Sequence, residues 1–187
     1  MTAGAYLLSD DLGAYAVERF SCGAGPAGWR YVATREQPGT GAPLGRLDVV
    51  VDAHGAAVRV AVQAAGWLLR GGVVGDEVLW RRGADERSAV ATGFTGSSPV
   101  WVLAATRRLT GPAAALRLVR LGDEALSTTL VDQRWTPGRR QDHDGLEVWH
   151  HEVADLATGR AWSVGTAGDL VVHAPGTQLL EVSPPAP

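Results

Sequence analysis

A serine, an aspartate and a histidine follow one another in hydrolase order near the end of the 187-residue chain, at Ser163, Asp169 and His173. The segment around the serine, Ala161–Gly165, resembles a degenerate nucleophile elbow, the strand–turn–helix corner that exposes the serine of α/β-hydrolases. In enzymes with a nucleophile elbow, the catalytic acid and histidine come from loops that are well separated in sequence. Here all three residues fall within one predicted hairpin, so we expect no catalytic triad.

The run Gly23–Gly28 matches the GxGxxG pattern of dinucleotide-binding proteins. That pattern holds a pyrophosphate only where it opens a helix, because the helix N-terminus supplies the N–H groups. The residues that follow, Trp29–Arg35, alternate as a strand does. The run therefore predicts a hairpin turn, and no cofactor is expected.

Five histidines are the remaining candidates for acid–base or metal chemistry. His54 and His143 lie in predicted turns, and the spacing of the five does not match a zinc site. His150 and His151 are adjacent on a predicted strand and therefore point to opposite faces. We expect one of them to face inward, bonded to a neighbouring group rather than to a ligand. No metal is expected.

The cluster of ionisable residues in Glu147–Asp155 leaves one enzymatic hypothesis open. His150 would act as a base on a hydrophobic substrate, with a carboxylate as its partner. Glu152 shares a face with His150 on an alternating strand, whereas Asp155 does not, so Glu152 is the better partner.

Tryptophan is the most unusual feature of the composition, with seven tryptophans against two phenylalanines. In a closed small barrel they would form the core. In a wider half-barrel some would line a cavity, because indole offers a large apolar surface and one N–H donor. Both readings stay open from the sequence. The seven are Trp29, Trp67, Trp80, Trp101, Trp135, Trp149 and Trp162.

Composition excludes several function classes. The apolar share of 45% and the charged share of 20% are ordinary for a globular protein, and the net charge of −3 does not favour nucleic acid or an anionic membrane as a partner. All 17 basic residues are arginines, so neither a Schiff-base lysine nor a P-loop is available. Cys22 is the only cysteine, and we find neither a signal peptide nor a membrane-spanning run. We therefore expect a cytoplasmic protein.

Strand-like segments recur about every ten residues and are separated by Gly, Pro or Asp. The only strong helix pattern covers about residues 98–109, with Ser98 as N-cap, Pro99 in the first turn and Gly111 at the end. This predicts a mainly β fold: a curved antiparallel sheet of about a dozen strands, a half-barrel or open barrel, with one helix against its concave side. We expect a single domain, residues 1–187, with 1–13 and 183–187 loosely ordered.

Three patches of sequence, taken together, resemble a glycolipid-binding family of bacterial proteins. They are Gly93–Pro99 with Arg107–Leu109, Val131–Thr136, and Asp169–Gly176. The resemblance implies a curved antiparallel sheet similar to that of periplasmic lipoprotein carriers, with a helix on its concave side. It also implies non-catalytic binding of a glycolipid or another amphipathic ligand.

The cavity of such a half-barrel suggests which residues touch the ligand. Acyl chains would lie on the apolar inner face. At the mouth, Arg134 would bind phosphate or carboxylate and Gln133 would bind sugar hydroxyls, with His150 beside them. The candidate ligand-binding residues are Trp67, Trp80, Phe94, Trp101, Gln133, Arg134, Trp149 and His150.

A third hypothesis needs no ligand. The tryptophans would form a filled core, and an exposed edge strand would pair with a second copy to make a homodimer. An interior filled by side chains would favour this structural module over both the binding protein and the enzyme.

Overall fold

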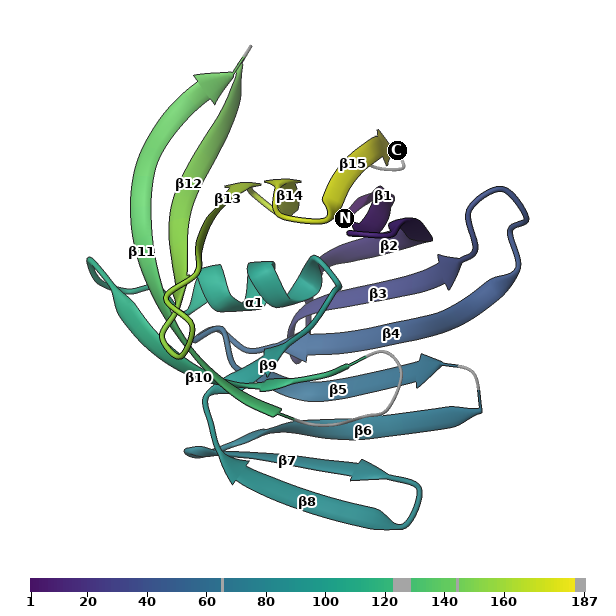
Figure 1. Ribbon diagram of the computed structural model, residues 1–187. Helices are drawn as coiled ribbons and strands as arrows, with labels where there is room; N and C mark the ends of the chain where they lie inside the picture. Colours follow the sequence, from purple (N-terminus) through teal and green to yellow (C-terminus); the bar gives the residue numbers. More distant parts are fainter. Residues whose placement is uncertain (65, 123–128, 144, 184–187) are drawn as a thin grey trace.

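The computed structural model describes residues 1–64, 66–122, 129–143 and 145–183 (Figure 1). These residues form fifteen strands in two sheets and one helix. The mainly β, antiparallel architecture with a single helix confirms the coarse prediction. A single curved sheet of about a dozen strands is not what forms, because the chain divides its strands between two sheets.

The larger sheet has nine strands and is antiparallel throughout. Eight of the nine follow one another in sequence as neighbouring hairpins, and the last strand of the chain pairs with the first. In order across the sheet they are β15 (Thr177–Ser183), β1 (Thr2–Asp10), β2 (Gly13–Gly25), β3 (Gly28–Glu36), β4 (Pro43–Val51), β5 (Ala57–Ala64), β6 (Trp67–Val74), β7 (Glu77–Arg82) and β8 (Asp85–Val90).

The smaller sheet has six strands and contains one parallel pair. β9 and β10 run parallel and are connected through the helix, because a parallel pair needs a long crossover. The prediction was an antiparallel sheet, so this parallel pair corrects it. In order across the sheet the strands are β14 (Leu170–His173), β13 (Ala161–Ala167), β12 (Leu146–Asp155), β11 (Thr129–His143), β10 (Ala114–Arg120) and β9 (Gly93–Thr95).

The glycine run Gly23–Gly28 forms the turn between β2 and β3, where Gly25 and Gly28 are register partners. Gly28 has a φ of +118°, and a Cβ there would stand 2.3 Å from the carbonyl oxygen of Val51. Only glycine fits that close approach to the neighbouring strand. The predicted hairpin turn is therefore confirmed.

The N-terminus corrects one prediction. Residues 1–13 were expected to be a loose lead-in, yet Thr2–Asp10 forms β1, with Tyr6 and Leu8 fully buried. Asp10 and Asp11 lie at the turn into β2, whereas the apolar residues before them pack in the core. At the other end of the chain, Ser183 belongs to β15, and residues 184–187 lie outside the described part.

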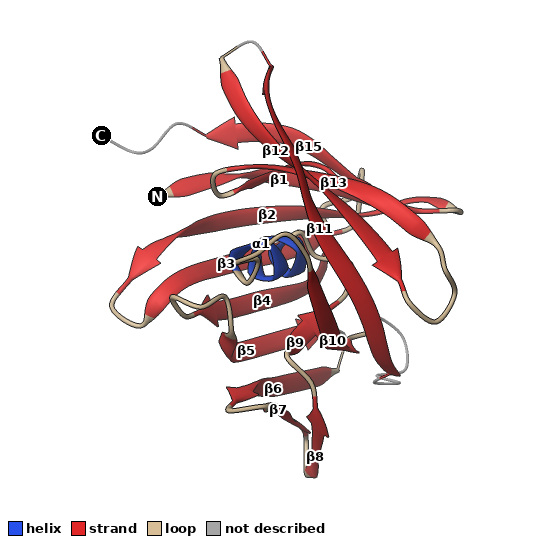
Figure 2. Cartoon of the chain, turned by 90° about the vertical axis from the view of Figure 1, so that its left-hand side faces the viewer, coloured by secondary structure: helices blue, strands red, loops and turns tan. Residues whose placement is uncertain are grey.

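Helix α1 (Val100–Arg107) lies between the two sheets (Figures 1 and 2). It is shorter than the predicted 98–109, and its N-cap is Pro99, with no side-chain cap. Ser98 therefore lies one residue before the N-cap, where its hydroxyl donates to the Glu18 carboxylate at 2.6 Å and accepts from the backbone N–H of Val100 at 3.4 Å. Five of the eight helical side chains are buried, so the helix fills part of the space that the sheets enclose.

Candidate functional site

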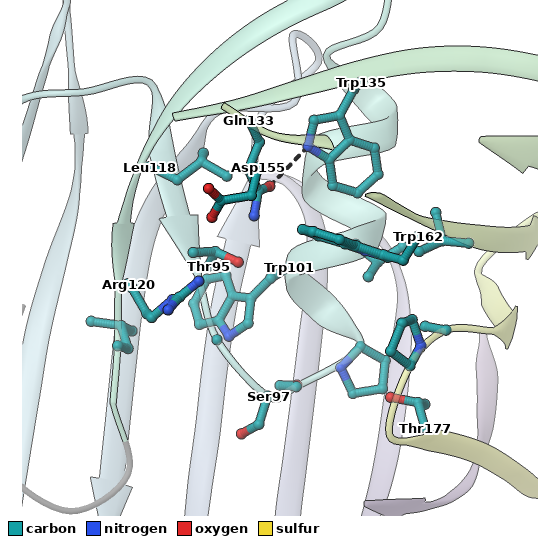
Figure 3. A pocket seen from close by; sticks show the side chains of 18 of the residues that line it. Thr95, Ser97, Trp101, Leu118, Arg120, Gln133, Trp135, Asp155, Trp162 and Thr177 are labelled. Atoms are coloured by element: carbon teal, nitrogen blue, oxygen red, sulfur yellow. Dashed lines mark hydrogen bonds between the residues drawn. The ribbon is translucent and has the colours of Figure 1, made fainter. Parts of the chain in front are cut away.

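A cavity of about 530 Å³ lies between the N-terminal end of α1 and the six-stranded sheet (Figure 3). Its walls come from the segment that leads into α1, from the helix, and from the strands and turns of the smaller sheet. The lining includes Thr95, Ser97, Ser98, Trp101, Leu118, Arg120, Gln133, Trp135, Asp155, Thr158, Arg160, Trp162 and Thr177.

Three tryptophans from three different elements converge on this cavity. Trp101 projects from α1, Trp135 from β11 and Trp162 from β13. Trp101 and Trp135 are almost fully buried, whereas Trp162 is half-buried. Phe94 packs behind Trp101, with 5.9 Å between ring centroids. Together these rings form an aromatic wall, and the half-buried Trp162 leaves part of it accessible to a ligand.

Gln133 provides the polar group beside this wall. It lies two residues before Trp135 on β11, so both side chains share one face of the strand. The indole N–H of Trp135 donates to the Gln133 side-chain oxygen at 3.0 Å (Figure 3). The amide NH₂ of this buried glutamine is then the end that remains for a ligand acceptor.

Asp155 lines the cavity but is committed to the turn after β12. Its Oδ1 accepts from the backbone N–H of Thr158 at 2.8 Å, from the Thr158 hydroxyl at 3.0 Å and from the N–H of Ala157 at 3.0 Å. These bonds, the backbone bond of Thr158 foremost, hold the pKa of Asp155 below its usual value. The carboxylate therefore stays ionised and stabilises the turn rather than acting as an acid.

Two arginines border the opening, Arg120 at the end of β10 and Arg160 in the turn before β13. Both are exposed. Among the described residues, neither guanidinium forms an ion pair with a carboxylate. Arg120 is close enough to Asp155 for its charge to contribute to the lowered pKa of that carboxyl. The guanidinium donors of both arginines can bind phosphate or carboxylate, so the mouth of the cavity is suited to an anionic group.

The N-terminal end of α1 is anchored by a buried carboxylate. Glu18 is fully buried on β2 and accepts from Tyr31 at 2.7 Å, from Ser98 at 2.6 Å and from Arg35 at 2.9 Å. Burial, followed by the nearby Glu18 charge, raises the pKa of Tyr31 well above its usual value. This network ties the segment that lines the cavity to the nine-stranded sheet. This network was not predicted, although Glu18 interrupts an apolar period-two stripe on β2.

The structure brings together only some of the predicted binding residues. Trp101 and Gln133 line the cavity, and Phe94 supports Trp101. Trp67 and Trp80 lie on β6 and β7 of the other sheet, where the guanidinium of Arg82 stands 5.7 Å from the Trp67 ring.

The other three predicted residues lie away from this cavity. Arg134 is exposed on the opposite face of β11 from Gln133, since neighbouring strand residues alternate. Trp149 and His150 lie on β12, where the His150 ring stands 5.7 Å from that of His143. The same alternation places Trp135 on the same face of the strand as Gln133, so this neighbour could have been predicted. Trp162, Arg120 and Arg160 reach the cavity through strand pairing, which spacing in the sequence does not reveal.

The candidate catalytic groups are arranged as follows. Ser163 and His173 are exposed and stand 3.2 Å apart, but Asp169 is bound to Arg107 at 2.6 Å. Glu152, the proposed partner of His150, is exposed. His151, and not His150, is the more deeply buried of the adjacent histidines, at 6% exposure.

No family model, curated protein or solved structure matched the chain in comparisons with known proteins. The likeness to glycolipid-binding proteins therefore stays a prediction, and function must be argued from the cavity. Within the described ranges, no group of three or more His, Cys, Asp or Glu is placed to hold a metal ion. Among the described residues, no helix has the length and apolar character that a membrane span requires.

Proposed function

We propose that the protein binds an amphipathic small molecule, without catalysis, in the cavity at the N-terminal end of α1. The observation that carries this proposal is the convergence of Trp101, Trp135 and Trp162 on a space bordered by Arg120 and Arg160. The apolar part of the ligand lies along the indoles, and its anionic head group lies at the arginines.

The size and chemistry of the cavity suit such a ligand. About 530 Å³ falls within the range of small-molecule sites, roughly 300–1,000 Å³. Burial of each CH₂ group contributes about 0.8 kcal/mol, so a short alkyl chain supplies much of the affinity. Gln133 adds an amide that binds a hydroxyl or an ester oxygen. A glycolipid with an anionic group fits this description and agrees with the resemblance noted in the sequence.

The proposal retains two expectations from the sequence. We take the hollow that receives the ligand as the counterpart of the concave side of the predicted half-barrel. Its walls come from α1 and mainly from the six-stranded sheet, with Thr177 at the start of β15. Cys22 is free and buried, which is compatible with the cytoplasmic location that its isolation suggested.

Calorimetric titration with dodecyl phosphate below its micelle concentration tests the proposal. We expect one saturable site, weakened about tenfold by Trp162→Ala and about fivefold by the double change Arg120→Gln and Arg160→Gln. Dodecyl maltoside, which has a neutral sugar head, should lose affinity with Trp162→Ala but not with the arginine changes.

Two matched variants serve as controls. Trp67→Phe removes an indole from the other sheet, and Arg134→Gln removes an exposed arginine from the far face of β11. Both should leave dodecyl phosphate binding unchanged. Loss of affinity in either control, or equal affinity in all variants, would place the amphiphile elsewhere.

A further inference from the structure

Trp101 presents its indole N–H to the cavity at the N-terminal end of α1, which we call the amphiphile cavity. The side chain is 4% exposed, and its Nε1 keeps accessible surface, unlike the ring nitrogens of His151. In Figure 3 this nitrogen, drawn in blue, faces the cavity. Within the described part of the chain the Trp101 N–H has no acceptor, whereas the Trp135 N–H donates to Gln133. An indole nitrogen only donates, so Trp101 is suited to an accepting oxygen of a ligand.

Gly96 leaves space beside this N–H. A Cβ at residue 96 would stand 3.1 Å from Nε1 of Trp101 and 3.1 Å from the carbonyl oxygen of Leu121. The backbone does not demand glycine at this position, because the φ of Gly96 is not positive. The missing side chain therefore leaves the indole nitrogen uncovered on this side, where an oxygen atom of a ligand can approach it.

Arg120 brings charged donors to the same corner of the cavity. Thr95, which precedes Gly96, is the register partner of Arg120 in the parallel pair of β9 and β10, and its carbonyl accepts from the Leu121 N–H at 2.8 Å. The side chains of Thr95 and Arg120 both line the cavity, and Figure 3 shows them around Trp101. A guanidinium and an indole N–H thus face one space.

The hollow at the other end of α1, of about 810 Å³, offers a ligand less. Arg107 in its lining is bound to Asp169 at 2.6 Å, and Glu147 forms an ion pair with Arg140. The ring nitrogens of His151 have almost no accessible surface, so a molecule in that hollow does not reach them. The charged groups of this lining are already bound, which leaves the corner at Trp101 as the place where head-group chemistry is selected.

We propose that the head group bound in the amphiphile cavity is a phosphate monoester, selected over a carboxylate by the Trp101 N–H and by the space at Gly96. This inference rests on the proposed function. A guanidinium that binds with two parallel N–H groups occupies two oxygens of an anion. A carboxylate then has no further oxygen, whereas a phosphate monoester has a third terminal oxygen, which accepts from Trp101. The ester oxygen leads into the alkyl chain, which lies along Trp135 and Trp162.

The indole N–H gives a direct test by NMR. The full chain labelled with ¹⁵N has seven tryptophan indole signals, and the contact with Gly96 assigns the one from Trp101. We expect dodecyl phosphate, below its micelle concentration, to move this signal downfield saturably, and dodecanoate to move it much less. A Trp101 signal that stays in place while calorimetry shows dodecyl phosphate bound would overturn the proposal.

Two variants separate the donor from charge. The wild-type chain should bind dodecyl phosphate about tenfold more tightly than dodecanoate. Trp101→Phe removes the N–H but no charge, so this preference should fall to about twofold, through weaker binding of the phosphate alone. Gly96→Ala, which crowds the nitrogen and leaves the indole in place, should have the same effect. A preference that survives both changes would show that charge alone selects the head group and would overturn the proposal.

The head-group inference and the proposed function can fail separately. Equal affinities for dodecyl phosphate and dodecanoate, both weakened by Trp162→Ala, would overturn the phosphate preference and leave the amphiphile site standing. Binding of neither compound would overturn both. Trp67→Phe, which removes an indole from the other sheet, is the matched control and should keep the full preference. Loss of the preference in this control would count against a selective role of Trp101.

Discussion

The two ends of helix α1 face cavities of different chemistry, although both lie against the same six-stranded sheet. At the N-terminal end, Arg120 and Arg160 form no ion pair within the described part of the chain, and the indoles form a wall. At the C-terminal end, Arg107 is already bound to Asp169 and His151 is neutral. Apolar surface is present at both ends, so the ligand that each cavity selects depends on which polar groups the fold leaves without a partner.

The anchoring of the helix differs in the same way. Its N-terminal end is tied to the nine-stranded sheet through the buried Glu18, whereas its C-terminal end is tied through a half-buried ion pair. A buried carboxylate that satisfies three donors holds its neighbours more firmly than a pair that water can reach. The amphiphile cavity is therefore the more preorganised of the two.

The largest effect is expected from removing that anchor. Glu18→Ala removes the acceptor that the Tyr31 and Ser98 hydroxyls share and one bond of the Arg35 guanidinium. The free energy of unfolding should therefore fall by about 3–5 kcal/mol. Urea unfolding measures this change. Glu36→Ala, which removes a partly exposed partner of Arg19, should cost no more than about 1 kcal/mol. Equal losses in the two variants would show that burial of Glu18 has no special role.

The next largest effect separates the cavities by their aromatic walls. Trp162→Ala should lower dodecyl phosphate affinity about tenfold, which is about 1.4 kcal/mol, because an indole face is lost from the apolar part of the site. Trp67→Phe, which changes an indole of the other sheet, should leave that affinity unchanged. Equal losses of affinity in the two variants, measured by calorimetry, would contradict the assignment of the site.

Charge at the mouth gives a smaller and salt-dependent effect. The combined change of Arg120→Gln and Arg160→Gln should weaken dodecyl phosphate about fivefold at low salt, and by less at 1 M salt, where exposed charges are screened. Titrations at the two salt concentrations measure it. A salt-independent loss would point to altered structure rather than to lost attraction.

The smallest effect concerns pH and the C-terminal end. The pKa of His151 is lowered in the folded protein, so below about pH 6.5 the unfolded chain binds a proton that the folded chain does not. The free energy of unfolding should therefore fall as pH drops through 6.5 toward the lowered pKa, and should not change from this cause above it. His151→Phe should flatten the profile, whereas His54→Phe, in an exposed turn, should not.

Much of the local structure could be predicted from the sequence. Strand alternation predicted the mainly β fold. The strand-like residues after Gly23–Gly28 predicted a hairpin turn rather than a nucleotide site, and the structure has that turn. The helix was located to within two residues at each end. These features depend on residues close together in the chain, which is why spacing reveals them.

Long-range pairing could not be predicted in this way. The division into two sheets, and the meeting of Trp101, Trp135 and Trp162, depend on which strands become neighbours. The prediction that Arg134 and Gln133 bind the same ligand was inconsistent with strand alternation, which places adjacent residues on opposite faces. Glu18 was detectable as the one acidic residue in a buried stripe of β2, yet its partner Ser98 lies eighty residues away.

Native mass spectrometry of the freshly purified full chain tests the central claim most directly. The account predicts a bound amphiphile at one copy per chain, or, after delipidation, one copy of added dodecyl phosphate. This adduct should be lost in the variant that combines Trp162→Ala with Arg120→Gln and retained in the variant that combines Trp67→Phe with Arg134→Gln. A chain that carries no amphiphile and takes up no dodecyl phosphate would contradict it.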